Sequence, residues 1–143
     1  CVTFASIRRK LRSLSWRRRP FDGRRALGRR GERAAAQHLK RRRYRILARN
    51  YRCVAGEIDL IASQDATIVF VEVKTRQEDD DDDGRLPVRD EQRGRIARAA
   101  QHFLAHPAAQ DRPYRFDVIS VAFSSRGKPQ IEHHEDAFSP SRV

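Results

Sequence analysis

The chain has 143 residues, which is enough for one domain with a buried core and too short to expect two. Its 31 Lys and Arg residues against 19 Asp and Glu residues leave a formal net charge of +12. This charge favours a polyanionic partner, with nucleic acid as the first candidate and an anionic membrane surface as the second. No apolar run approaches the roughly 20 residues of a membrane-spanning helix, so we expect a soluble protein.

The cysteines, Cys1 and Cys53, indicate neither a disulfide framework nor a zinc site. We therefore expect a reducing, cytoplasmic compartment. We divide the chain into a basic, flexible arm (1–23), a folded domain (24–138) and a short tail (139–143). The arm is interpreted first as a mobile tail; a helix that grips phosphates or docks on a surface is the alternative.

A first helix is predicted over residues 26–43, because Leu27 begins a stripe of small and apolar residues that recurs every four positions. Glu32 lies on the inward side of this helix rather than on its Arg-rich side. One interpretation is an ion pair with a neighbouring Arg at the helix start. The other is an acid that faces a functional site.

Three strands are predicted next, over residues 44–51, 56–62 and 67–74, from their β-branched and aromatic residues. The short link at 63–66 predicts an antiparallel hairpin between the second and third strands. In the second strand, alternation places Ile58 and Leu60 on one face and Glu57 and Asp59 on the other.

In the third strand, Glu72 and Lys74 share one face, while Val71 and Val73 share the other. Asp59 can join Glu72 and Lys74 if the hairpin register is suitable. Charges inside a sheet are costly unless they are paired or bind a metal. Two carboxylates suit Mg²⁺, and Lys74 would then hold the attacking water or stabilise charge on a phosphate.

The run Asp79 to Asp83 is expected to form a solvated, mobile loop. After Pro87 a second helix is predicted to extend to His106, with Gln92 at the start of its inward stripe. Gln92 either reaches the site or makes a hydrogen bond at the helix start.

A fourth strand is predicted over residues 114–123, in which we expect Asp117 to be a structural ion-pair partner rather than a metal ligand. A short last strand is predicted over residues 131–135. Its neighbouring His133 and His134 point to opposite faces, so they cannot easily bind one ion, and we expect both to be exposed.

Five segments together carry a more specific signal: residues 28–35, 44–52, 56–61, 69–76 and 115–118. They resemble the YraN family of bacterial proteins (UPF0102), over roughly Arg24 to Phe138. That family is similar to Holliday junction resolvases and to the PD-(D/E)XK nucleases. The resemblance implies an α/β fold with a restriction-endonuclease-like αβββαβ core, in which helices flank a mixed central sheet.

The resemblance also implies residue roles. Asp59 and Glu72 would be ligands of Mg²⁺ or Mn²⁺, Lys74 would position the attacking water, and Glu32 would be the acid supplied by the first helix. The expected substrate-binding residues are Gln92, Arg76, Arg29 and Arg30. In this chain Glu91 stands where family members usually carry a Lys, which makes the neighbourhood of a DNA groove more acidic.

These roles predict a Mg²⁺-dependent endonuclease that acts on structured or branched DNA, with a homodimer as the expected assembly for resolvase-like activity. The alternatives are a nuclease-fold module that binds nucleic acid without turnover, and a basic adaptor for a protein or membrane surface.

Overall fold

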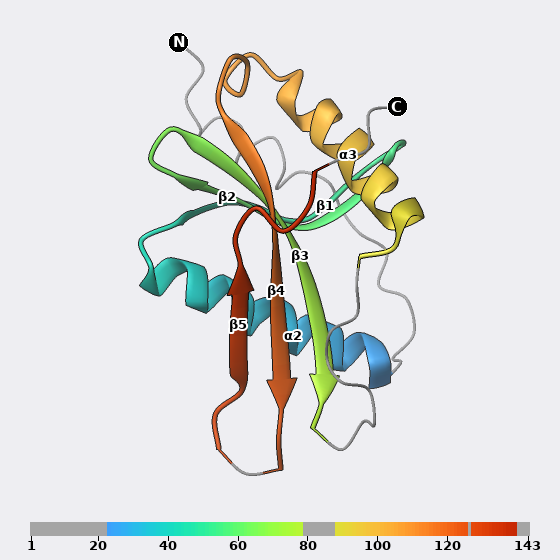
Figure 1. Ribbon diagram of the computed structural model, residues 1–143, viewed down its shortest axis with the longest axis vertical. Coiled ribbons are helices and arrows are strands. Elements are labelled where there is room, and N and C mark those ends of the chain that lie inside the picture. Colours follow the sequence, from blue (N-terminus) through green and yellow to red (C-terminus); the bar gives the residue numbers. More distant parts are fainter. Residues whose placement is uncertain (1–22, 79–87, 126, 140–143) are drawn as a thin grey trace.

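The computed structural model describes residues 23–78, 88–125 and 127–139. Residues 1–22 of the predicted arm (1–23) and the Asp79 to Asp83 run lie outside these ranges. The elements, labelled as in Figure 1, are α2 (Gly23–Arg41), β1 (Arg45–Cys53), β2 (Gly56–Gln64), β3 (Thr67–Gln77), α3 (Asp90–Leu104), β4 (Tyr114–Phe123) and β5 (Gln130–His134). This order contains the predicted αβββαβ core. The bounds of β4 are those expected, and the other elements begin or end a few residues from their predicted limits.

One five-stranded mixed sheet, in the order β1-β2-β3-β4-β5, forms the centre of the molecule. β1, β2 and β3 pair antiparallel in turn, which confirms the predicted hairpin. β3 and β4 pair in parallel, and β5 returns antiparallel to β4. A parallel pair needs a crossover connection, and α3 lies on it. The predicted restriction-endonuclease-like architecture is confirmed.

The two helices cover opposite faces of the sheet (Figure 1). Leu39 of α2 belongs to a core with Val69 and Val71, whereas Phe103 of α3 belongs to a second core with Phe70. Successive residues of β3 therefore alternate between two apolar layers. Neither helix in the described ranges is long and apolar enough to cross a membrane.

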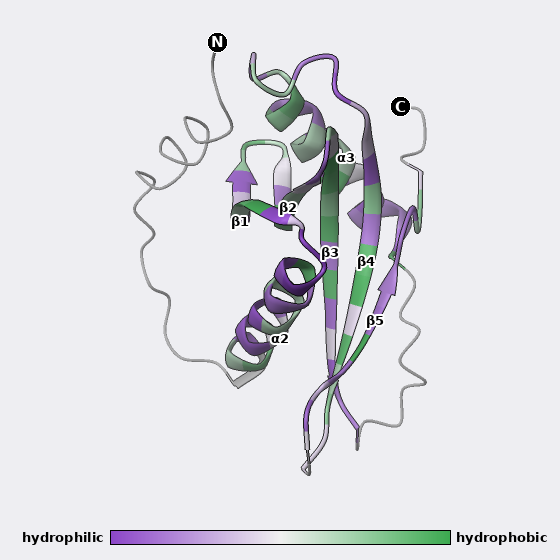
Figure 2. Ribbon diagram, turned by 90° about the vertical axis from the view of Figure 1, so that its left-hand side faces the viewer, coloured by the Kyte–Doolittle hydropathy of each residue, from purple (hydrophilic) through white to green (hydrophobic). Residues whose placement is uncertain are grey.

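The second half of β3 carries the polar residues of this strand. Figure 2 shows β3 hydrophobic in its upper part and increasingly hydrophilic lower down. The first ionisable residue of β3 is Glu72, which is buried. The middle of the sheet thus holds polar side chains that require partners.

One predicted face assignment is wrong. Ile58 packs in the core beside α3, whereas Leu60 packs in the core beside α2. The residue between them, Asp59, lies opposite Asn50, because the neighbouring pairs are Arg49↔Leu60 and Tyr51↔Ile58. Asn50 has a left-handed backbone, with φ of 49°. A residue in that conformation interrupts the regular alternation of a strand, so simple alternation fails here.

Candidate functional site

Glu72 and Lys74 lie side by side on the face of β3 that is turned toward α3. Val71 and Val73 pack on the opposite face, against the core that includes α2. Lys74 Nζ lies 3.5 Å from Glu72 Oε1. Because Glu72 is only 8% exposed, this ion pair offsets part of the cost of burying its carboxylate.

Asp59 lies where β2 separates from β3. The ladder between these strands ends at the pair Leu60↔Val71. Asp59 Oδ2 then accepts a hydrogen bond of 2.8 Å from the backbone N–H of Val73. This bond places the Asp59 carboxylate beside Glu72, and the two carboxyl groups interact directly. The structure thus brings Asp59, Glu72 and Lys74 together.

Gln92, in the first turn of α3, links the two polar residues of β3. Its Oε1 accepts a hydrogen bond of 3.0 Å from Lys74 Nζ. Its Nε2 donates to Glu72 Oε1. A single amide therefore fixes the orientation of both an acid and a lysine, because it donates at one end and accepts at the other.

Glu32 reaches the same place from α2. The residue before it, Gly31, lies so close to β3 that an added Cβ would stand 1.9 Å from Thr75 Oγ1. The half-buried Glu32 carboxylate accepts a hydrogen bond from the Asn50 side chain and lies within electrostatic reach of Asp59. The arginine that acts on Glu32 is Arg52 of β1, not a neighbouring arginine at the start of the helix, and Asp59 acts on Glu32 more strongly than Arg52 does.

The carboxylates of this cluster hold protons more tightly than usual. Burial raises the pKa of Glu72 to about 8, with the Asp59 carboxylate adding to the effect and Lys74 opposing it. Burial also raises the pKa of Asp59. The pKa of Glu32 rises to about 7, again mainly through burial and then through Asp59. The cluster therefore has more negative charge than Lys74 can balance when all three acids are ionised.

The donor set suits a small, hard cation. Among the described residues, no group of three or more His, Cys, Asp and Glu side chains is arranged to hold a metal ion. Asp59 and Glu72 would thus supply two carboxylates, with water filling the other positions. Mg²⁺ is commonly held in this way, since it binds through one or two carboxylates and keeps several waters. Its positive charge would also balance the buried acids.

Two of the arginines predicted to bind substrate lie on α2, and the third lies near the end of β3. Arg29 is exposed on α2, and Arg76 is half-buried two residues after Lys74. The Arg30 guanidinium lies over the Phe123 ring, 4.5 Å from its centroid, so part of its cationic surface already has a partner. A role for these three residues in substrate binding stays a prediction.

Glu57 lies at the edge of the cluster, where it acts electrostatically on Asp59 and Glu32. It is largely exposed and forms an ion pair of 3.2 Å with Arg52. Near the start of β2, Glu57 is thus a solvated partner for an arginine.

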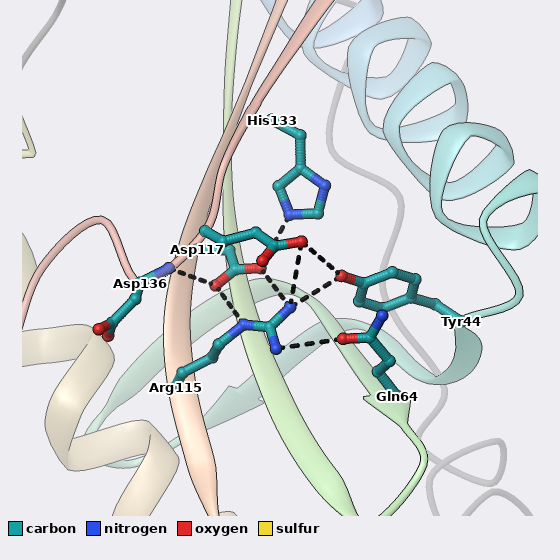
Figure 3. A network of polar contacts seen from close by, with 7 residues as sticks. Tyr44, Gln64, Arg115, Asp117, His133 and Asp136 are labelled. Atoms are coloured by element: carbon teal, nitrogen blue, oxygen red, sulfur yellow. Dashed lines mark hydrogen bonds and ion pairs between the residues drawn. The ribbon is translucent and has the colours of Figure 1, made fainter.

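A second polar network lies around Asp117, which is fully buried (Figure 3). Its Oδ1 accepts hydrogen bonds from Arg115 Nε at 3.0 Å and from the Asp136 backbone N–H at 2.9 Å. Its Oδ2 lies 2.8 Å from His133 Nε2. Arg115 also donates to the Tyr44 hydroxyl at 2.7 Å. Burial would raise the pKa of Asp117, but these bonds outweigh it and lower the pKa. Asp117 is therefore a structural ion-pair partner, as predicted.

The expectation that His133 is exposed is wrong. Its side chain is 3% exposed, whereas that of His134 is 55% exposed. The two do point to opposite faces, but β5 pairs with β4 so that His133 meets the buried Asp117. The alternation of Ile131 and His133 with the charged Glu132 was the sequence signal for a half-buried edge strand.

These features define a mixed α/β protein with a carboxylate–lysine cluster where two strands of its central sheet separate. Residues 31–121 match the family model described as uncharacterised protein family UPF0102, and the chain belongs to this family. A UPF0102 protein of Geobacter metallireducens is 47% identical over 113 residues, covering 79% of this chain and 92% of the relative. One of Roseiflexus castenholzii is 42% identical over 116 residues, covering 79% and 94%. The resemblance found in the sequence is confirmed at the level of the family.

Proposed function

We propose that this protein is a Mg²⁺- or Mn²⁺-dependent endonuclease that hydrolyses phosphodiester bonds in structured or branched DNA. The observation that carries this proposal is the meeting of Asp59, Glu72 and Lys74 at the fork between β2 and β3. The net charge of +12 supports a polyanionic substrate. A residue set of this kind suits hydrolysis, because it combines oxygen donors for a cation with a separate ammonium group.

The chain's own residues have distinct tasks in this proposal. Asp59 and Glu72 would hold the cation, which when bound would supply Lewis-acid stabilisation of charge on the phosphate. Lys74 holds the attacking water and offsets negative charge that develops at phosphorus. Gln92 keeps Lys74 beside Glu72. The water oxygen bonds to phosphorus, the bond to the leaving oxygen breaks, and solvent takes the proton of the water and protonates the leaving group.

The test is cleavage of labelled four-way junction, flap, duplex and single-stranded DNA with Mg²⁺, Mn²⁺ or EDTA. We expect cleavage that depends on the metal and is greatest for a branched substrate. Glu72→Gln and Lys74→Met are the matched variants, since each nearly keeps the side-chain volume and removes one charge. Each should lower the cleavage rate by at least about 100-fold.

Cleavage by the wild type no faster than by Glu72→Gln would sink the proposal. If salt-sensitive DNA binding then survives in Lys74→Met, the protein is a binding module of nuclease fold. The predicted homodimer is tested separately, by the molar mass in solution with and without a four-way junction.

A further inference from the structure

β1 and β2 both change face at the same position. On β1, Ala48 and Tyr51 both pack in the core beside α3, although an odd spacing should place them on opposite faces. Leu47 packs there too, next to a separate register shift between Ile46 and Ala48. On β2, Ile58 and Ile61 do the same. Asn50 and Asp59 are the opposed residues within these two intervals, since Arg49 pairs with Leu60 and Tyr51 with Ile58. The hairpin therefore shifts its alternation in both strands at once.

The backbone of Asn50 accounts for the shift on β1. Its φ of 49° lies in the left-handed region, which Asn enters more readily than other residues that carry a side chain. The shift lies one position beyond the point where the β2–β3 ladder ends, at Leu60↔Val71. It thus coincides with the place where Asp59 turns to the Val73 N–H.

The side chain of Asn50 makes a second link. Its amide hydrogen-bonds to Glu32, which arrives from α2 and lies within electrostatic reach of Asp59. The side chain of Asn50 therefore contacts Glu32 of α2. The backbone of Asn50 lies opposite Asp59 in the pairing of β1 with β2. Glu32 is half-buried, so without this bond its carboxylate would be free to turn toward Arg52 or solvent.

We propose that Asn50 is a positioning residue of the cation site: its left-handed backbone sets the hairpin shift that aims Asp59, and its amide holds Glu32 against Asp59. This inference rests on the proposed function, because it assumes that the acids bind a divalent cation. In this role Asn50 would act through Asp59 and Glu32 and not by binding the cation or the substrate itself.

Asn50→Gly separates the two parts of this role. Glycine keeps the left-handed backbone at no steric cost and removes the amide. Asp65→Gly is the matched control, because Asp65 has a similar φ of 52° and lies exposed in the β2–β3 turn. Each substitution is made in the wild type and in Glu32→Gln, and unfolding by urea is measured in EDTA. Mn²⁺ affinity is measured by calorimetry on the four resulting variants, on the wild type and on Glu32→Gln.

We expect Asn50→Gly to weaken Mn²⁺ binding by about tenfold, the size of effect typical of residues that orient metal ligands. In the Glu32→Gln background the same change should weaken it less than about twofold, since the group that Asn50 orients is altered. The urea midpoints should show the same non-additivity. Asp65→Gly should leave the Mn²⁺ affinity unchanged, and its effects should be additive with those of Glu32→Gln.

Equal Mn²⁺ affinity in Asn50→Gly and Asp65→Gly would overturn the inference, as would additive effects of Asn50→Gly and Glu32→Gln. A failure of the proposed function is distinguishable from this. It would appear as absent DNA cleavage while the Mn²⁺ affinities and the non-additivity remain as expected.

Discussion

Gly31 of α2 lies in close contact with Thr75 of β3. An added Cβ at Gly31 would lie 1.9 Å from Thr75 Oγ1 and 2.9 Å from its Cβ and Cγ2, so rotation of the threonine alone would not make room. The next residue along the helix is Glu32, and the residue before Thr75 is Lys74. The distance between α2 and β3 at this contact thus also affects how far Glu32 lies from the acid cluster beside Lys74.

Gly31→Ala is therefore expected to lower both stability and metal affinity. The displaced helix should cost about 1–3 kcal/mol in the free energy of unfolding, as overpacking usually does. Gly28→Ala is the control on the same helix, because a Cβ there meets nothing within 4 Å. It should raise stability by about 0.5–1 kcal/mol. Urea denaturation and Mn²⁺ calorimetry would measure the two effects; equal stability of both variants contradicts the close-contact argument.

The acid cluster predicts an unusual pH dependence for the metal-free protein. The ordinary pKa of a glutamate is 4.5, whereas in the fold the pKa of Glu72 is about 8 and that of Glu32 is about 7. At pH values between 4.5 and about 8, the folded protein keeps protons on these glutamates that the unfolded chain has released. These glutamates therefore make the free energy of unfolding fall as pH rises. Mg²⁺ should oppose the loss, and its stabilising effect should be larger at about pH 9 than at about pH 6.

Thermal unfolding in EDTA and in Mg²⁺ at both pH values checks this expectation. Glu72→Gln is the control, since it removes the carboxyl group whose pKa rises to about 8 in the fold. Its metal-free stability should fall less with rising pH. A wild-type protein that Mg²⁺ stabilises equally at both pH values would argue against the buried acids as the metal site.

Asp117 should have the opposite dependence on pH. Its pKa is lowered in the fold, so its contribution to stability is present above the ordinary value of 3.8 and is lost as pH falls through the folded value. Asp117→Asn should cost about 3–5 kcal/mol near neutral pH, because it leaves Arg115 without its buried partner. Asp65→Asn, an exposed site, should change stability by less than about 0.5 kcal/mol. Urea unfolding from acid to neutral pH compares the two; similar losses would refute a structural role for Asp117.

Arg29 and Arg30 offer a separate test of DNA binding. If both contact phosphates, each alanine substitution should lower the salt dependence of binding by about one counterion. Arg30→Ala should in addition lower stability by about 0.5–1 kcal/mol, because Arg30 lies over Phe123. Fluorescence anisotropy at several salt concentrations gives the slope. An unchanged slope for both variants would exclude these arginines from the interface.

Much of this fold could be predicted because its signals are local. β4 occupies the predicted residues, since its alternating apolar pattern is bounded by Pro113 and Ser124. The proximity of Asp59 and Glu72 was predicted from local sequence on the condition that the hairpin register is suitable. A short turn fixes the register of the hairpin that carries both, from Gln64↔Thr67 to Leu60↔Val71.

What the sequence did not reveal depends on distant partners. His133 is buried because Asp117, on the neighbouring strand, accepts its hydrogen bond. The face on which Ile58 lies differs from the predicted one because the alternation of side chains is interrupted beside it. That interruption coincides with the left-handed backbone of Asn50 on the neighbouring strand. Neither partner can be assigned from spacing along the chain, although an Asn inside a strand pattern is a useful warning of irregular backbone.

The two carboxylates of the site belong to one hairpin, whereas β4 joins β3 only after the chain has passed through α3. Closing a short turn is faster than closing a long connection, so Asp59 and Glu72 meet early in folding. Their mutual repulsion must then be overcome before α3 supplies Gln92. A divalent cation that neutralises them at this stage should accelerate refolding, which links the chemistry of the site to the order in which the sheet assembles.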